Sequence, residues 1–184
     1  MTTVLVVILV LVLIVGGFFG WYVSASNNIK RAEIKVAEAL SGIDVALTKR
    51  YDVLTKMVDI VKSYKEYEHQ TFTDVIGLRM GMSMKERNDA SAKLDSLASE
   101  LRLVAENYPV LKSSENFAML QRSVMDVEEH LQASRRLYNA NVTAFNNLIV
   151  AFPSSIVASN LGKVQKAFFE ADATKRQDVS MTNL

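Results

Sequence analysis

The stretch RRLYNANVTAFNNLIVAFP, residues 135–153, decides the fold of this chain. Its large apolar side chains recur at intervals of three and four residues, at Tyr138, Val142, Phe145 and Ile149. Because an α-helix completes a turn in about 3.6 residues, these side chains share one helix face, and the interleaved asparagines are predicted to occupy the other faces. A helix cannot continue through Pro153, which lacks the backbone N–H. The stretch therefore predicts the end of a long helix that packs against other helices.

The same rhythm extends to the N-terminal side of this stretch and marks two earlier segments. The first segment begins near Ile29, and the second ends at Tyr108, because the residue before Pro109 avoids helical geometry. The residues predicted to form the bundle core are Leu40, Ile43, Leu47, Leu54, Val58, Val61, Leu97, Leu101, Phe117, Leu120, Val124, Leu131, Tyr138, Val142, Phe145 and Ile149. Charged residues of alternating sign, such as Lys56 and Asp59, are predicted to form a solvated opposite face.

These patterns predict an all-α chain. After an N-terminal transmembrane helix we expect an elongated, antiparallel, up-and-down helical bundle with coiled-coil-like packing. It would contain three long helices and a short C-terminal helix from Val164 to Glu170, docked through Leu161, Val164 and Phe168. The expected segments are an anchor at 1–23, a junction at 24–28 that continues the helix, a bundle at 29–172 and a mobile polar tail at 173–184.

The N-terminal segment from Val4 to Val23 contains no charged residue. As a helix it would cover the roughly 30 Å hydrocarbon core of a bilayer. Trp21 and Tyr22 stand at its end, where amphipathic rings suit the lipid interface. No basic residue precedes the run and it exceeds a usual signal-peptide core, so a permanent single-pass anchor is favoured over a cleavable signal peptide.

Basic and small residues add expectations about this anchor. Basic residues follow the span closely, at Lys30, Arg31 and Lys35, which favours a cytosolic bundle and an external N-terminus. Gly16 and Gly20 form a G-x-x-x-G pair with Gly17 between them, a pattern that lets two membrane helices approach closely. The alternative is that these glycines only reflect the composition of membrane helices.

Composition excludes several classes of function. The chain has 21 basic and 20 acidic residues and a formal net charge of +1, so no field favours nucleic acid. It has no cysteine, which excludes disulfides, thiolate metal sites and cysteine nucleophiles. We therefore predict no nucleic-acid partner.

The motifs of known chemistry are sparse. Glu66 and His69 share a helix face, but a di-iron bundle needs two such pairs, and no second pair occurs. The sequence contains no nucleophile elbow and no Gly-rich phosphate loop. Three methionines, Met80, Met82 and Met84, share one predicted loop, where thioethers suit either partner contact or Cu(I). No catalytic residue, resident metal or cofactor is predicted.

Several stretches in order resemble the LemA family of bacterial membrane-anchored proteins. They are GIDVALTKRYDVLTKMVDIVKSYKEYEHQ, the segment from ENYPVLK to LIVAFP, and KAFFEAD. The most specific part is a Tyr-Asn-x-x-Val…Asn…Phe-Pro run, formed by Tyr138, Asn139, Val142, Asn146, Phe152 and Pro153. The resemblance implies a long helical bundle behind one N-terminal helix, with an external N-terminus and a cytosolic bundle at the inner membrane. It implies no reaction.

Together these observations predict a non-enzymatic, membrane-tethered scaffold or adaptor that acts through helix–helix contacts. Its partners would be the lipid bilayer, further copies of itself in a homo-oligomer, and another membrane protein. One alternative is a regulatory subunit of a membrane protease or of a stress-response system. The other is a metal-handling protein that uses the loop of Met80, Met82 and Met84.

Overall fold

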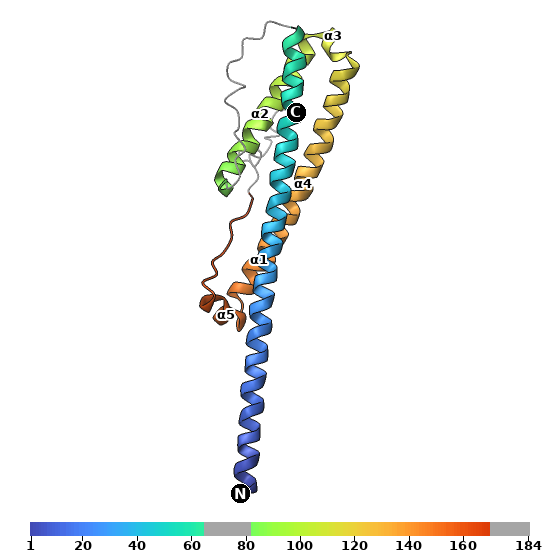
Figure 1. The fold of residues 1–184 in the computed structure, drawn as a ribbon. Coiled ribbons are helices and arrows are strands. Elements are labelled where there is room, and N and C mark those ends of the chain that lie inside the picture. Colours follow the sequence, from blue (N-terminus) through green and yellow to red (C-terminus); the bar gives the residue numbers. More distant parts are fainter. Residues whose placement is uncertain (65–81, 170–184) are drawn as a thin grey trace, which may run out of the picture. The chain divides into compact units, whose positions relative to one another are not determined.

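The computed structural model describes residues 1–64 and 82–169. The elements are α1 (Thr2–Tyr64), α2 (Met84–Asn107), α3 (Pro109–Lys112), α4 (Glu115–Val150) and α5 (Ser154–Asn160) (Figure 1). No strand occurs in these ranges, which confirms the all-α class. Among the described residues, one helix is by itself long and apolar enough to span a membrane by length and composition, and it is the predicted N-terminal one. The bent pair of α4 and α5 passes the same test only when the two helices are taken together. Glu66, His69, Gly77, Met80 and the polar tail lie outside the described residues.

The chain forms two compact units that share α1 and α4. The N-terminal unit comprises Met1–Glu38 and Asn139–Ala167, and the three-helix unit comprises Ala39–Tyr138 and Phe168–Leu184. Helix α1 runs through residues 24–28 without a break, so within the N-terminal unit the apolar segment and the following residues are one helix. Neither glycine nor proline stands in that junction to interrupt it.

In the three-helix unit, paired side chains fix the direction of each helix. Asp44 of α1 binds Arg87 of α2, and six residues later Arg50 binds Asp95, so α1 and α2 run parallel. Helix α4 runs antiparallel to both, because Gly42 of α1 lies beside Ser134, whereas Arg50, further along α1, contacts Glu128, which comes earlier in α4. The predicted up-and-down order is therefore wrong for α1 and α2. An apolar stripe looks the same in either chain direction, so periodicity could not distinguish the two arrangements.

The buried face of each helix follows the apolar stripe closely but not everywhere. Most of the predicted core residues are buried, and Leu47, Leu54, Leu131, Val142 and Phe145 are 0% exposed. Leu40 is half-buried, because its neighbour Ala39 takes the buried position one turn after Val36. Val124 is half-buried because it lines an open pocket. At Gly42 a Cβ added to α1 would lie 3.8 Å from Ser134 Oγ of α4, which is an ordinary van der Waals contact.

The helix ends are capped by local chemistry. Ser83 and Glu86 form a reciprocal capping box at the start of α2, in which each side chain accepts a hydrogen bond from the other residue's backbone N–H. Tyr108 closes α2, as predicted from Pro109, which opens the short helix α3. Met84 is the first residue of α2, so it does not belong to a loop.

The short C-terminal helix begins ten residues earlier than predicted. It starts directly after Pro153, at a bend of 94° from α4, and residues 163–169 are not helical. Gly162 ends α5 with a φ of 62°, and the amides of Gly162 and Lys163 bind the carbonyls of Ser159 and Ala158. This left-handed cap, which suits glycine, stops the helix before Val164. Of the three predicted docking residues, Leu161 is half-buried, whereas Val164 and Phe168 are exposed, so the prediction is wrong at these two positions. Phe169, the residue after Phe168, is buried instead.

Candidate functional site

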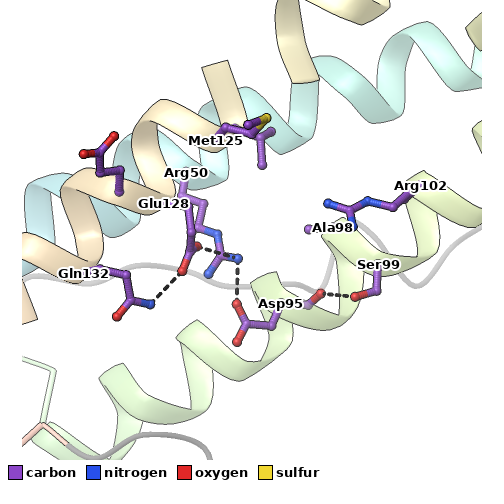
Figure 2. Close-up of a pocket in the computed structure, with 10 residues that line it drawn as sticks. Arg50, Asp95, Ala98, Ser99, Arg102, Met125, Glu128 and Gln132 are labelled. Carbon is purple, nitrogen blue, oxygen red and sulfur yellow. Dashed lines mark hydrogen bonds and ion pairs between the residues drawn. The ribbon is translucent and has the colours of Figure 1, made fainter. Parts of the chain in front are cut away.

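The three-helix unit contains an open pocket of roughly 520 Å³ between α1, α2 and α4. Figure 2 shows that Arg50 reaches into it from α1, between the carboxylates of Asp95 on α2 and Glu128 on α4. The residues that line it are Arg50, Asp95, Ala98, Ser99, Arg102, Val124, Met125, Glu128, Glu129 and Gln132. The pocket is therefore a polar site in an otherwise apolar interior.

Arg50 is the centre of this site. The residue is 4% exposed, and its Nη2 lies 2.6 Å from Asp95 Oδ1 and 2.9 Å from Glu128 Oε2. The contact with Glu128 is short but lacks hydrogen-bond geometry, so we treat it as electrostatic attraction. Gln132 holds the other oxygen of Glu128 through a hydrogen bond of 2.8 Å from its Nε2. One cation thus joins three helices.

Two nitrogen atoms of the Arg50 guanidinium have no hydrogen-bond acceptor among the described residues. Its Nε and Nη1 are buried and make no hydrogen bond to the described residues. A guanidinium has five N–H donors in a fixed plane, and carboxylates on one side cannot reach all of them. The site is therefore built around a charge that is costly to bury, which makes Asp95 and Glu128 indispensable to it.

A second guanidinium stands beside the first. Arg135 of α4 donates a hydrogen bond from Nη2 to Ser91 Oγ of α2, and its Cζ lies 4.7 Å from the centroid of the Phe169 ring. Burial lowers the pKa of the Arg135 guanidinium, Glu128 and Asp95 oppose that shift, and the nearby Arg50 adds to it. The cluster therefore balances two arginines against two carboxylates across three helices.

A third ion pair closes the beginning of α2. Arg87, which is 6% exposed, binds Asp44 through two bonds, Nε to Oδ1 at 2.6 Å and Nη2 to Oδ2 at 2.8 Å, and its Nη1 donates to the Met82 carbonyl. The hydrogen bonds with Asp44 raise the pKa of Arg87, against the opposing effect of burial. Such a paired, planar contact fixes the register of α2 against α1.

The N-terminal unit has its own polar cluster. Glu33 of α1 binds Lys163 Nζ at 2.5 Å and Lys166 Nζ at 3.3 Å. The Asn146 side chain of α4 donates to the Lys166 carbonyl at 3.0 Å and accepts from the Lys166 N–H at 2.9 Å. Asn141 donates to the Lys35 carbonyl at 3.2 Å. These contacts hold the segment after α5 and the end of α4 against α1.

The two asparagines correct the expectation that all asparagines of this stretch lie on outward faces. Asn141 and Asn146 are half-buried and bind the backbone of other segments, whereas Asn147 is exposed. An amide side chain can donate and accept at once, so one residue can pair with both polar groups of a non-helical backbone. Asn146 belongs to the motif that resembles the family's. Its two hydrogen bonds with the Lys166 backbone give Asn146 a structural role.

The predicted site residues fall into three groups. Gly16, Gly17 and Gly20 are exposed, and a Cβ built at any of them would meet nothing within 4 Å. Trp21 and Tyr22 are half-buried, and the Trp21 ring lies 5.6 Å from that of Phe18. Of the three methionines, Met82 and Met84 are half-buried and Met80 lies outside the described residues.

Sequence reasoning missed the buried arginines, although the pattern contained a signal for them. The stripe of α1 has a gap of seven residues between Leu47 and Leu54, and Arg50 fills the missing helical position. The stripe of α4 has the same gap between Leu131 and Tyr138, where Ser134 is buried. Gaps of two turns in a long stripe therefore marked Arg50 and Ser134, but no such gap marked Arg87.

The pocket contains no arrangement typical of catalysis. Three of its ionisable residues, Arg50, Asp95 and Glu128, pair between helices, and no group of three or more metal-ligating His, Cys, Asp or Glu residues occurs in the described part of the chain. The geometry instead joins helices, which is a structural task.

Two comparisons with known proteins test the family resemblance. The model of the LemA family matches residues 39–182. Protein LemA of Metamycoplasma hominis is 30% identical to this chain, over 96% of this chain and 83% of that protein. The chain therefore belongs to the LemA family.

Proposed function

We propose that this protein is a membrane-anchored, non-enzymatic scaffold that acts through helix–helix contacts, as a homo-oligomer and with other membrane proteins. The observation that carries the proposal is the start of α1, whose most apolar window is 0% buried within the chain. Residues 1–20 are all exposed, including large side chains such as Leu13 and Phe19 at 66% and 67%. This segment needs a cover that the described part of the chain does not supply.

The energy of that exposure favours lipid as the cover. Burying one Val, Leu, Ile or Phe side chain stabilises by about 1.5–3 kcal/mol relative to water. The segment carries such residues at nearly every position from Val4 to Phe19, interrupted only by Gly16 and Gly17. Their sum far exceeds the stability of an ordinary domain, which is about 5–15 kcal/mol. A bilayer satisfies all of them without a specific partner.

Contact between two anchors would then use the glycines. Gly16 and Gly20 are one helical turn apart, and the space beside each is open. In lipid, where no hydrophobic effect draws helices together, close backbone approach at small residues supplies the packing energy. This supports a homo-oligomer whose contact lies within the membrane.

The position of the remaining chain follows from its basic residues. Lys30, Arg31 and Lys35 are exposed just beyond the apolar segment. The excess of basic residues favours the cytosolic side, so we place the bundle in the cytosol at the bacterial inner membrane and the N-terminus outside. The ion pairs of the pocket support a scaffold, since they are used to hold helices together.

The test is self-association of the full chain in phospholipid nanodiscs, measured by crosslinking and by mass. Gly16→Leu with Gly20→Leu is expected to abolish the oligomer, because two bulky side chains separate the backbones. The matched control is Val10→Leu with Ile14→Leu, which has the same spacing on another face and is expected to keep it. A wild-type chain that is monomeric at all concentrations would contradict the homo-oligomer. Co-purification of one protease in a fixed ratio would favour the regulatory-subunit alternative instead.

A further inference from the structure

The corner between α4 and α5 carries an apolar surface that nothing in the described chain covers. Phe152 is 83% exposed, Val150 is 55% exposed and Ile156 is 52% exposed. The inner side of α5 is held in place, since Val157 and Ala158 are 0% and 1% exposed. We call Val150, Phe152 and Ile156 the corner patch. Helix α5 therefore packs against the N-terminal unit on one side and exposes an apolar side chain, Ile156, on another.

The corner patch lies level with the end of the apolar segment of α1. The two belong to the same N-terminal unit, in which α4 runs antiparallel to α1 and Asn141 binds the Lys35 carbonyl. Val150 follows Asn141 by nine residues, or about 14 Å at a rise of 1.5 Å per residue. The same nine residues lead back from Lys35 to Ser26, only three beyond Val23. Figure 1 accordingly shows α5 beside the part of α1 that follows the apolar segment.

The orientation of α5 suits a surface rather than a span. The bend of 94° turns α5 across the direction of α4, and so across α1, which α4 accompanies in this unit. If α1 crosses the bilayer, α5 lies close to its plane. A helix in that orientation can sink one apolar side into the boundary between headgroups and acyl chains.

The sequence around the corner lacks the charges that would oppose such contact. No Asp, Glu, Lys or Arg occurs between Arg136 and Lys163. On α1 the aromatic residues Trp21 and Tyr22 stand at nearly the same level, and such rings prefer the bilayer interface. The exposed basic residues Lys30 and Arg31 come next along α1, at the height of lipid phosphates.

From this placement we propose that the corner patch is a second membrane contact, inserted into the headgroup–acyl boundary of the leaflet where α1 emerges. The inference rests on the proposed membrane anchor. Its occupant is lipid, because a level, uncharged patch beside an interfacial aromatic pair matches a bilayer surface better than a folded partner. The protein would then touch the membrane at two places, and the N-terminal unit would stand at a fixed height above it.

Spin labels on single-cysteine variants test the proposal, since the chain contains no cysteine to remove. The full-length protein is placed in vesicles of phosphatidylcholine and phosphatidylglycerol. Phe152→Cys reports the corner patch, and Ile34→Cys, a 65% exposed apolar position of α1 in the same unit, is the matched control. Collision with oxygen and with a water-soluble nickel chelate gives the depth of each label. Both positions are exposed, so neither label displaces packed atoms.

The Phe152 label is expected at a depth of about 5–10 Å, with a several-fold higher ratio of oxygen to nickel collisions than the Ile34 label. Equal ratios at the two positions would overturn the second contact. Protection of Phe152 from both reagents would also overturn it, because a protein surface would then cover the patch. A third label at Leu9 separates the two proposals. Lipid exposure at Leu9 with water exposure at Phe152 removes only this inference, whereas water exposure at Leu9 removes the anchor as well.

Discussion

Single side chains decide which helices stay together in the three-helix unit. Arg50 is 4% exposed and bridges Asp95 and Glu128, and Arg87 binds Asp44 by two parallel bonds. A buried ion pair adds little net stability compared with apolar residues of the same size, but it penalises every alternative arrangement that would leave a charge unpaired. These residues therefore select one packing of the amphipathic helices.

Removal of one partner should be costly. Arg50→Met is expected to destabilise the fold by about 3–5 kcal/mol, because Asp95 and Glu128 remain partly buried without their cation. Urea unfolding followed by circular dichroism measures this loss. The control Arg102→Met, at an exposed position on the same pocket, is expected to change stability by less than about 0.5 kcal/mol. Adding Glu128→Leu to Arg50→Met should recover part of the loss in stability. An Arg50→Met variant as stable as the wild type would contradict the proposed role of Arg50 in joining the three helices.

Residue by residue, the sequence predicted the apolar core better than the polar contacts. Large residues such as Phe117 and Phe145 lie where the periodicity places them, because burial of apolar area depends mainly on the helix face. Arg50 and Asn146 were not predicted, because their partners, Glu128 and Lys166, come from other segments. An apolar stripe predicts which face of a helix is buried. Polar contacts between helices depend on how the helices are aligned along their axes, and the stripe of a single helix does not predict that alignment.

At the scale of the element, the segment after α5 is not helical, and ion pairs hold it against α1. Lys163 and Lys166 both bind Glu33, and the hydrogen bond from Lys163 is the largest cause that lowers the pKa of the Glu33 carboxyl below its ordinary value of 4.5. Lys166 lowers it further, while burial acts in the opposite direction. These contacts hold residues 163–166, which lack regular structure, against α1.

This ion pair makes a prediction about pH. A carboxyl whose pKa is depressed by folding stabilises the folded state above its unfolded pKa, and the contribution disappears as pH falls through the folded value. Glu33→Gln should therefore lower the thermal midpoint at pH 7, and the difference from wild type should shrink once the pH falls below 4.5. Glu38→Gln, at an exposed position of α1, is the control and should show no such trend. A difference that stays constant with pH would rule out the Glu33 contact.

Two glycines should respond to alanine in opposite ways. Gly162 has a φ of 62°, which strains any residue with a Cβ, so Gly162→Ala should cost about 1–2 kcal/mol. Gly42 lies inside α1, where a Cβ would meet Ser134 Oγ at an ordinary 3.8 Å, so Gly42→Ala should stabilise by about 0.5–1 kcal/mol. Unfolding midpoints of both variants give the two signs. Destabilisation by Gly42→Ala would show that α1 and α4 are closer there than described.

At the scale of the whole molecule, the sequence predicted the all-α class and the long apolar N-terminal helix more reliably than the topology. The two prolines set the ends of α2 and α4, because each removes a backbone donor. The parallel order of α1 and α2 could not be predicted, since it depends on which end of α2 meets Asp44. The position of α5 was predicted too late in the chain, because Val164 and Phe168 mimic a helical stripe that the Gly162 cap prevents.

The proposed topology makes a prediction for labelling in cells. Asn116→Cys, at an exposed position of α4, should be protected from a membrane-impermeant maleimide in intact cells and should react after lysis. Thr3→Cys should react before lysis, because the N-terminus is proposed to lie outside. Reaction of Asn116→Cys in intact cells, with protection of Thr3→Cys, would reverse the proposed orientation.

The unbroken course of α1 through residues 24–28 also determines rotation about the helix axis. Nine residues separate Gly20 from Ile29, which is about two and a half turns, so the glycines and the buried side of α1 at Ile29 point in opposite directions. A second anchor could therefore approach Gly16 and Gly20 from the side of α1 opposite to Ile29. Because α1 has no flexible break in residues 24–28, rotation of the anchor about its axis would rotate Glu33 by the same angle. The ion pair between Glu33 and Lys163 would move with it.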